Sequence, residues 1–382
     1  MKKLILSIFV LVLLFIVACA QQAAQPTAQQ PVKLEGSYKI GVMMPLTGDA
    51  AAYGISEQRG IKIALDEINA KGGVNGRKLE AVYEDSKCNP KDGNSAAQKL
   101  VNVDKVEVVV GGACSGETLG AAPITEENKV VLISPTASSP DLTKAGDFVF
   151  RVYPSDAYAG IVASEYAYNE LQARKVALVT ETTDYAQGLR MVFKENFAKL
   201  GGEIVADETY NPEDTDFRTQ ATKVKSAEAD IIYVVPQTPA KGLLLLKQIK
   251  ELGIDKPILT AEVLIGKKNV ADNPADLEGI TGIDLKFDEK TPKAAALLAK
   301  YKQVSGEDPE FPSFIATAYD AVNLVADAIR ANGYNGEGIR DYLYAVKDYD
   351  GAAGKITIDE NGDPIMEYSI LQVKNSQPVM LK

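Results

Sequence analysis

The stretch KIGVMMPLTGDAAAYGISEQRGIKIALDEINAKGG, residues 39–73, contains the unit that decides the fold. It opens with Lys39–Met44, a short apolar run of the kind that forms a buried strand. In Gly60–Ala70, apolar residues recur at positions 61, 64, 65 and 68, which places them on one face of a helix. Gly72-Gly73 then provides a helix stop. The stretch therefore predicts a β-strand followed by an α-helix.

The same alternation continues along the chain. Further strand-like runs are Leu79–Tyr83, Val106–Val110, Val130–Ile133, Phe148–Val152, Lys175–Val179, Ile231–Val235 and Pro257–Thr260. Helical patterns occupy residues 91–103, 157–172, 187–200, 216–227, 240–252, 292–304 and 314–332. Strands that alternate with helices of this length indicate parallel sheets built from βαβ units. Because the order restarts near Val152–Asp156, we expect two doubly wound α/β lobes with a ligand site between them, beyond the carboxyl ends of the strands.

The N-terminus has the features of an export signal. Met1-Lys2-Lys3 precedes an apolar run over residues 4–18, shorter than the roughly 20 residues that a membrane-spanning helix needs. The run ends at Ala18-Cys19, which resembles the cleavage site of a lipoprotein. We expect residues 1–19 to be a signal peptide ending at a lipidated Cys19, and residues 20–36, rich in Gln, Ala and Pro, to be a flexible tether. The alternative is an N-terminal anchor helix with an incidental cysteine.

The composition argues against several classes of function. The net charge of −11 gives an acidic surface that repels phosphate backbones, which argues against nucleic-acid binding. The chain has no histidine, which removes Ser-His-Asp chemistry and most zinc sites. No phosphate-binding or dinucleotide-binding glycine motif stands out. An enzyme that uses Asp, Glu, Lys or Tyr stays open, but we expect a binding protein with neither a metal nor a cofactor.

Two cysteines remain in the body of the chain. Outside the cytoplasm Cys88 and Cys114 can form a disulfide, worth about 3 kcal/mol in the chain-entropy model. The alternative is a pair of buried free thiols. The expected export favours the disulfide.

The body of the chain resembles the leucine/isoleucine/valine-binding proteins of the type I periplasmic binding protein family. The motifs that carry this resemblance, in order, are IGVMMPLTG (40–48), INAKGG (68–73), YEDSKCNP (83–90), GGACSGET (111–118), ISPTA (133–137) and YAQG (185–188). The resemblance implies two discontinuous lobes joined by three crossing strands. One lobe is expected from residues 37–155 plus 286–362, and the other from residues 156–285 plus 363–382. It also implies that Cys88 pairs with Cys114.

The resemblance implies a set of residues that bind the main-chain groups of an amino acid. Ser115 lies where a helix begins, a place that suits a carboxylate, although Ser is also the ordinary N-cap there. In the Thr136-Ala137-Ser138 segment, the Thr136 carbonyl and Ser138 hydroxyl are expected around the α-amino and α-carboxylate groups. The alternative is a plain turn. Glu262, at a strand end, is expected to pair with the ammonium.

Aromatic residues are expected to line the rest of the pocket. Tyr53, Tyr185 and Phe314 match wall positions of the family, and for each of them ordinary packing is the alternative. Gln237 departs from the family, which carries an aromatic residue there. A buried amide needs hydrogen-bond partners, so the ligand is expected to be larger or more polar than leucine.

Together these features predict an extracytoplasmic, lipid-anchored solute-binding protein. It would bind a branched-chain or other neutral amino acid by hinged closure and deliver it, as a monomer, to an ABC permease. The alternative is a ligand-sensing receptor module of the same fold for an amide, a urea or an aromatic acid.

Overall fold

A computed structural model describes residues 35–381 of the chain. The predicted signal peptide, Cys19 and most of the tether lie outside this range. The first sheet has five parallel strands in the order β2-β1-β3-β4-β5. Its strands are β1 (Ser37–Met44), β2 (Lys78–Asp85), β3 (Val108–Gly111), β4 (Val131–Ser134) and β5 (Val149–Arg151).

Helices cover both faces of this sheet, and together they form what we call the first lobe. One face packs against α2 (Ala51–Ala70), α12 (Pro312–Asn332) and α13 (Gly336–Tyr344). The other face packs against α3 (Pro90–Gln98), the π-helical turn Lys99–Val103 and α4 (Ser115–Glu127). Helix α11 (Pro292–Ser305) packs on α2 from outside. The hydrophobic residues of β1, β3 and β4 alternate between the two faces, as a sheet buried on both sides requires.

The second sheet has seven strands in the order β14-β13-β10-β9-β8-β6-β7. The strands from β7 to β10 in this order are parallel, whereas β13 runs antiparallel to both β10 and β14. The strands are β6 (Lys175–Glu181), β7 (Glu203–Tyr210), β8 (Ile231–Val235), β9 (Ile258–Ala261), β10 (Thr281–Leu285), β13 (Tyr368–Lys374) and β14 (Gln377–Met380). Antiparallel pairing at one edge was not among the sequence-based expectations.

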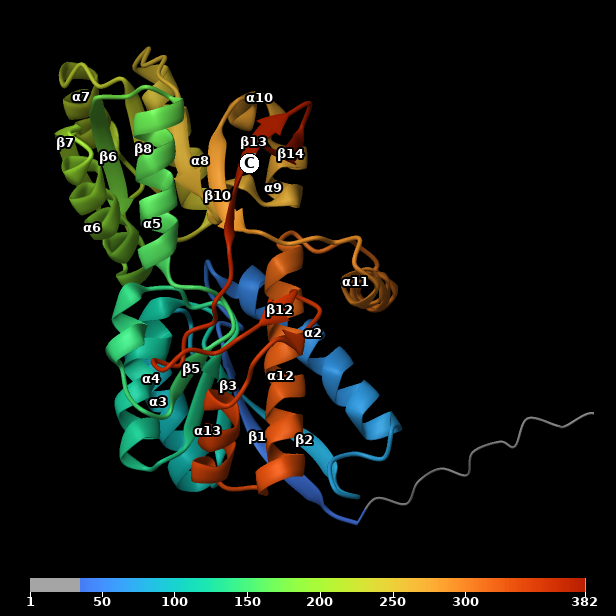
Figure 1. The fold of residues 1–382 in the computed structure, drawn as a ribbon. Helices are drawn as coiled ribbons and strands as arrows, with labels where there is room; N and C mark the ends of the chain where they lie inside the picture. The colour runs from blue at the N-terminus through green and yellow to red at the C-terminus, as the bar shows by residue number, and fades with distance from the viewer. Residues whose placement is uncertain (1–34, 382) are drawn as a thin grey trace, which may run out of the picture. The chain divides into compact units, whose positions relative to one another are not determined.

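The second lobe is this sheet with its helices, which lie in the upper half of Figure 1. One face packs against α5 (Asp156–Glu165), the π-helical turn Tyr166–Glu170 and α6 (Asp184–Lys199). The other packs against α7 (Arg218–Ser226), α8 (Pro239–Glu251), α9 (Lys267–Asp272) and α10 (Pro274–Leu277). Both lobes are thus three-layer α/β/α sandwiches. Among the described residues, no helix is both long and apolar enough to cross a membrane.

The chain passes between the two lobes three times. It leaves the first lobe after β5, returns after β10, and leaves again between the small ribbon β11–β12 (Tyr349–Asp350 and Lys355–Ile356) and β13. The first lobe is therefore completed by α11–α13, which come late in the sequence, and the second lobe by β13 and β14 (Figure 1).

Helix α2 is longer than its sequence pattern indicates, because it begins at Ala51 and not near Gly60. Two glycines interrupt the apolar pattern of its first half. A Cβ atom at Gly54 would lie 2.1 Å from the carbonyl oxygen of Pro45, so only glycine fits there. The extra turns carry Tyr53 and Glu57 to the carboxyl end of the sheet.

Candidate functional site

A pocket lies where the carboxyl ends of strands from both lobes face each other. Except for Phe314, which lies in α12, its lining residues follow β1, β3 and β4 in the first lobe and β6, β8 and β9 in the second. The pocket is lined by Tyr53, Glu57, Ala113, Cys114, Ser115, Thr136, Ser138, Tyr185, Gln237, Glu262, Val263 and Phe314. Every predicted binding residue except Ala137 is in this set. Ala137 is buried behind it, with its N–H donating to Ser134 Oγ at 2.8 Å.

Ser115 is the first residue of α4, and Cys114 is the N-cap. The reading of Ser115 as an N-cap is therefore wrong. Its Oγ accepts a hydrogen bond at 3.1 Å from the backbone N–H of Ser139, so its own hydroxyl proton stays free to donate. The first N–H groups of a helix have no partner within the helix and attract negative charge. This wall can therefore hold a carboxylate.

The loop after β4 offers acceptors beside this wall. The Ser138 hydroxyl donates to Asp156 Oδ2 at 2.7 Å, and the backbone N–H of Asp156 donates to the Ser138 carbonyl at 2.8 Å. Thr136 Oγ1 lies 2.9 Å from Glu57 Oε1 and 3.0 Å from the Ala113 carbonyl. With its proton directed at Asp156, the Ser138 hydroxyl faces the pocket as an acceptor.

Glu262 and Tyr185 form the opposite wall. Glu262 opens the 3₁₀ turn Glu262–Ile265 directly after β9, and Tyr185 lies in the first turn of α6. The Tyr185 hydroxyl donates to Glu262 Oε1 at 2.9 Å, and both side chains are buried. The Tyr185 hydroxyl thus holds the carboxyl group of Glu262 in place at the surface of the pocket.

The electrostatics of this wall favour a cationic partner. The pKa of Glu262 is raised well above its usual value, first by burial and then by the nearby Asp156 and Asp284. Burial also raises the pKa of Asp156 to about 7. No Lys or Arg is among the residues that line the pocket. An ammonium group at this wall would stabilise the ionised form of Glu262.

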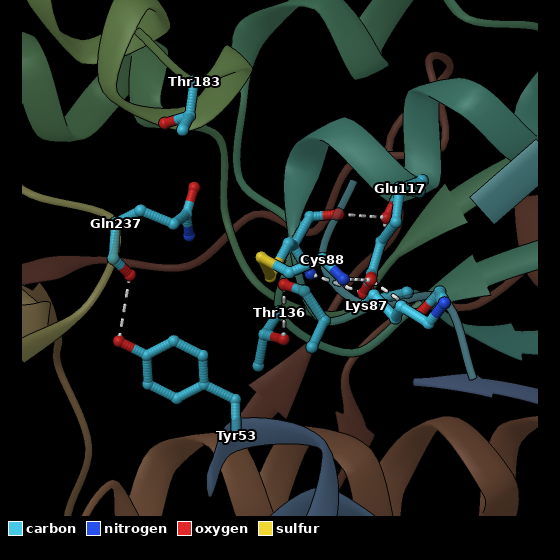
Figure 2. The surroundings of a disulfide bond; sticks show 12 residues. Tyr53, Lys87, Cys88, Glu117, Thr136, Thr183 and Gln237 are labelled. Carbon is cyan, nitrogen blue, oxygen red and sulfur yellow. Dashed lines mark hydrogen bonds between the residues drawn. A yellow bond between two sulfur atoms is a disulfide. The ribbon is translucent and has the colours of Figure 1, made fainter. Parts of the chain in front are cut away.

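Tyr53 connects the two lobes. Its hydroxyl donates to the backbone carbonyl of Gln237 at 3.1 Å. Figure 2 shows this hydrogen bond as a dashed line. Its ring meets Phe314 edge-on, with centroids 6.1 Å apart. The two rings lie side by side on the first lobe, while Gln237 faces them from the loop after β8.

The predicted disulfide between Cys88 and Cys114 is present. Glu117, fully buried, accepts from the backbone N–H of Cys88 at 2.8 Å, of Cys114 at 2.9 Å, and from Ser86 Oγ at 2.6 Å (Figure 2). Burial raises the pKa of Glu117 to about 7. The loop that carries Ser115 is therefore held both by a covalent bond and by a carboxyl group.

Sequence reasoning missed Glu57, Ala113 and Val263 as lining residues, and assigned Cys114 to the disulfide alone. One signal was available for Glu57. It precedes Ile61 by four residues and so extends the buried stripe of α2, which makes it a charged residue at a core position. Within residues 35–381, no group of three or more His, Cys, Asp or Glu is arranged to hold a metal ion.

A pocket built from the strand ends of two separate α/β sandwiches defines a two-lobed binding architecture. The family model for periplasmic binding proteins matches residues 37–378. The leucine-, isoleucine-, valine-, threonine- and alanine-binding protein of Pseudomonas aeruginosa is 32% identical over 328 residues, 85% of this chain and 86% of that protein. This chain belongs to the periplasmic binding protein family.

Solved structures agree with this assignment. The leucine-binding protein LivK of Thermotoga maritima superposes with a TM-score of 0.84 at 30% identity, covering 90% of this chain and 98% of that one. LivJ of Streptococcus pneumoniae is a branched-chain amino acid transporter substrate-binding protein solved in complex with isoleucine. It superposes with a TM-score of 0.81 at 34% identity, covering 91% of this chain and 99% of that one. The fold class and the family predicted from the sequence are confirmed.

Proposed function

We propose that this chain is the substrate-binding component of an ABC importer and that it binds an α-amino acid in the pocket between its lobes. The observation that carries the proposal is the pairing of two walls. Ser115 at the start of α4 suits the α-carboxylate, and Glu262 with Tyr185, across the pocket, suits the α-ammonium. The names of the relatives, which bind leucine, isoleucine and valine, support the same ligand class.

The binding mechanism follows from which lobe carries each group. In an open form, Ser115, the Thr136 carbonyl and Ser138 receive the main-chain groups of the ligand. Closure then brings Glu262 and Tyr185 against the ammonium and excludes water, which strengthens the ion pair. The Tyr53–Gln237 hydrogen bond forms only when the lobes meet, so it stabilises the closed form.

The moving parts in this mechanism are the discontinuous lobes, 37–155 plus 286–362 and 156–285 plus 363–382. The three chain crossings between them serve as the hinge. Support comes from the two sheets and their separate cores. The closed form would be the one that the permease recognises.

Membership of the periplasmic binding protein family indicates that the chain acts outside the cytoplasm. We further propose that a lipid on Cys19 anchors the protein to the membrane, that residues 20–36 form the tether, and that the body is a monomer. The lipobox-like Ala18-Cys19 sequence supports the anchor. Because relatives are named for binding and not for catalysis, we assign no enzymatic activity.

Titration calorimetry of the purified protein with a panel of amino acids tests the proposal. Saturable binding of at least one amino acid is expected, together with no binding of the same compound lacking its α-amino group. An aromatic acid without an ammonium group should also fail to bind, because it leaves Glu262 unpaired. A panel without any binding, or tight binding of a compound that lacks an amino group, would refute the assignment.

A further inference from the structure

Glu57 is a second carboxyl group in the pocket, and the mechanism above leaves it unused. It projects from α2 one turn after Tyr53, so both side chains reach the pocket from the same helix face. The side chain is completely buried. Its Oε2 atom has no hydrogen-bond partner among the residues that the structure describes. Buried carboxyl oxygens in folded proteins are normally hydrogen-bonded, which makes this one an exception that needs a partner.

The neighbours of Glu57 show which kind of partner it needs. The Ala113 carbonyl can only accept, and it lies 3.0 Å from Thr136 Oγ1, so the single Thr136 proton is well placed to go there (Figure 2). The Thr136 hydroxyl can also donate to Glu57 Oε1, at 2.9 Å, but its one proton cannot serve both acceptors. If that proton goes to the Ala113 carbonyl, the contact between Thr136 Oγ1 and Glu57 Oε1 needs a proton from Glu57. In that arrangement Oε2 is the carbonyl oxygen of a neutral carboxyl group, which is an acceptor.

The surroundings of Glu57 support a neutral group. Burial raises the pKa of Glu57 well above its usual value, and the carboxyl group of Glu117 raises it further, whereas a hydrogen bond donated by Thr136 to the ionised carboxylate lowers it. If Glu57 is instead ionised, Oε2 is a carboxylate oxygen and still an acceptor. In both arrangements Glu57 Oε2 is an unpartnered acceptor, which can accept a hydrogen bond from a donor group of a ligand in the pocket.

We propose that Glu57 is a ligand-binding residue whose Oε2 accepts a hydrogen bond from an N–H or O–H group of the bound solute. The proposal rests on the proposed function, because it assumes that this pocket is the ligand site. Two parts of an amino acid carry such donors, the α-ammonium group and a polar side chain. A hydroxyl or amide side chain would also face Gln237, the position where the aromatic residue of the family is absent.

The test compares Glu57→Met with Glu57→Gln. Methionine keeps the length of the side chain and removes the acceptor, while the Thr136 hydroxyl retains the Ala113 carbonyl. Glu57→Met should weaken ligand binding at least about tenfold in calorimetry. In Glu57→Gln, the amide N–H replaces the proton that binds Thr136 and the amide oxygen replaces Oε2, so affinity should stay within about threefold of wild type. A tenfold loss in both variants also supports the contact and assigns it to an ionised carboxyl group.

A second readout separates ligand contact from a structural role. Glu57→Met removes the unpartnered Oε2 acceptor together with the contact between Oε1 and Thr136. Because the gain from the first offsets the loss of the second, the ligand-free variant should unfold at about the same temperature as wild type. A purely structural carboxyl group would lower the unfolding temperature and leave the affinity unchanged. Weaker binding without loss of stability is therefore the expected combination.

Pairs of ligands identify the donor. Threonine and valine have nearly the same shape, so a loss in Glu57→Met that is larger for threonine assigns the contact to the side-chain hydroxyl. An equal loss for both assigns it to the ammonium. Affinities within a factor of two of wild type for every ligand overturn the proposal, as does a ligand-bound crystal structure with no donor within about 3.5 Å of Oε2. If wild type binds no amino acid at all, it is the proposed function that fails.

Discussion

Arg151 gives the sharpest test of how the region behind the pocket is held together. Its side chain is 1% exposed, and its guanidinium group donates to both carboxylate oxygens of Asp363, at 2.6 and 2.8 Å. It also donates to the Ser139 carbonyl at 2.8 Å and to Thr143 Oγ1 at 2.8 Å. Arg151 therefore connects the end of β5 to the loop after β4, through Ser139, and to the segment of the third crossing, through Asp363.

The change Arg151→Met should destabilise the protein strongly. It leaves the Asp363 carboxylate, whose side chain is 10% exposed, without its cation. Breaking a buried pair in this way typically costs about 3–5 kcal/mol, because an uncompensated charge stays in a poorly solvated place. The Thr143 hydroxyl still donates to Asp363 Oδ2 at 2.8 Å, so we expect a value near the lower end, about 3 kcal/mol.

Arg190→Met provides a matched control. Arg190 makes the same two-pronged contact with Asp207, at 2.6 and 2.7 Å, but the two side chains are 22% and 24% exposed. Lys194 also remains beside Asp207 after the substitution. We expect less than about 1 kcal/mol of destabilisation there.

Urea unfolding of the two variants, followed by circular dichroism, measures both free energies of unfolding. The double change Arg151→Met with Asp363→Leu should recover most of the lost stability, since it removes both charges. Equal losses in Arg151→Met and Arg190→Met, or a loss below 1 kcal/mol in the former, would refute the reasoning from burial.

Three further predictions concern the pocket and the buried acids. Glu262→Gln should weaken amino-acid binding roughly 10- to 100-fold. Wild-type affinity should fall between pH 8 and pH 5, because a protonated Glu262 cannot pair with an ammonium, and the variant should show a much smaller fall. Parallel pH profiles of the two proteins in calorimetry would contradict this. Replacing Cys88 and Cys114 by serine should lower the free energy of unfolding by about 3 kcal/mol, and unchanged urea midpoints would argue against it. Burial raises the pKa values of Glu117 and Asp320 to about 7 from usual values of 4.5 and 3.8, so the folded state holds more protons between about pH 4 and pH 7. Stability should therefore fall as the pH rises through that range, and urea midpoints that rise between pH 5 and pH 7 would count against these pKa values.

The order of strands and helices was predictable because the sheet of each lobe is covered by helices on both faces. Runs such as those at residues 176–179 and 231–235 are continuously apolar for that reason and are easy to recognise. The strand Glu203–Tyr210 was missed because it lies at the sheet edge and is polar and only half-buried along most of its length. The antiparallel strand β13 comes after a long irregular segment and not after a helix, so no βαβ pattern in the sequence predicts it.

The residues themselves indicate the candidate site best where a residue follows a recognisable strand end, whereas Tyr53 and Phe314 lie in helices and were expected from the family resemblance alone. Ser115, Thr136 and Glu262 each follow such a strand end, and they line one pocket. Glu57 lies within a helix, seven residues after the nearest loop, where a charged residue is usually exposed. Its burial depends on α12 and on the loop after β4, which are distant in the sequence, so its place on the buried stripe of α2 was the one sequence signal for it.

The hydrogen bond from Tyr53 to Gln237 has a consequence for the evolution of specificity. Its acceptor is the main-chain carbonyl of residue 237, which every amino acid possesses. Exchanging the side chain at this position therefore leaves the bond between the lobes in place, while it changes the surface that a solute meets. Position 237 can thus vary among descendants of this chain, altering what is captured without altering how the two halves come together.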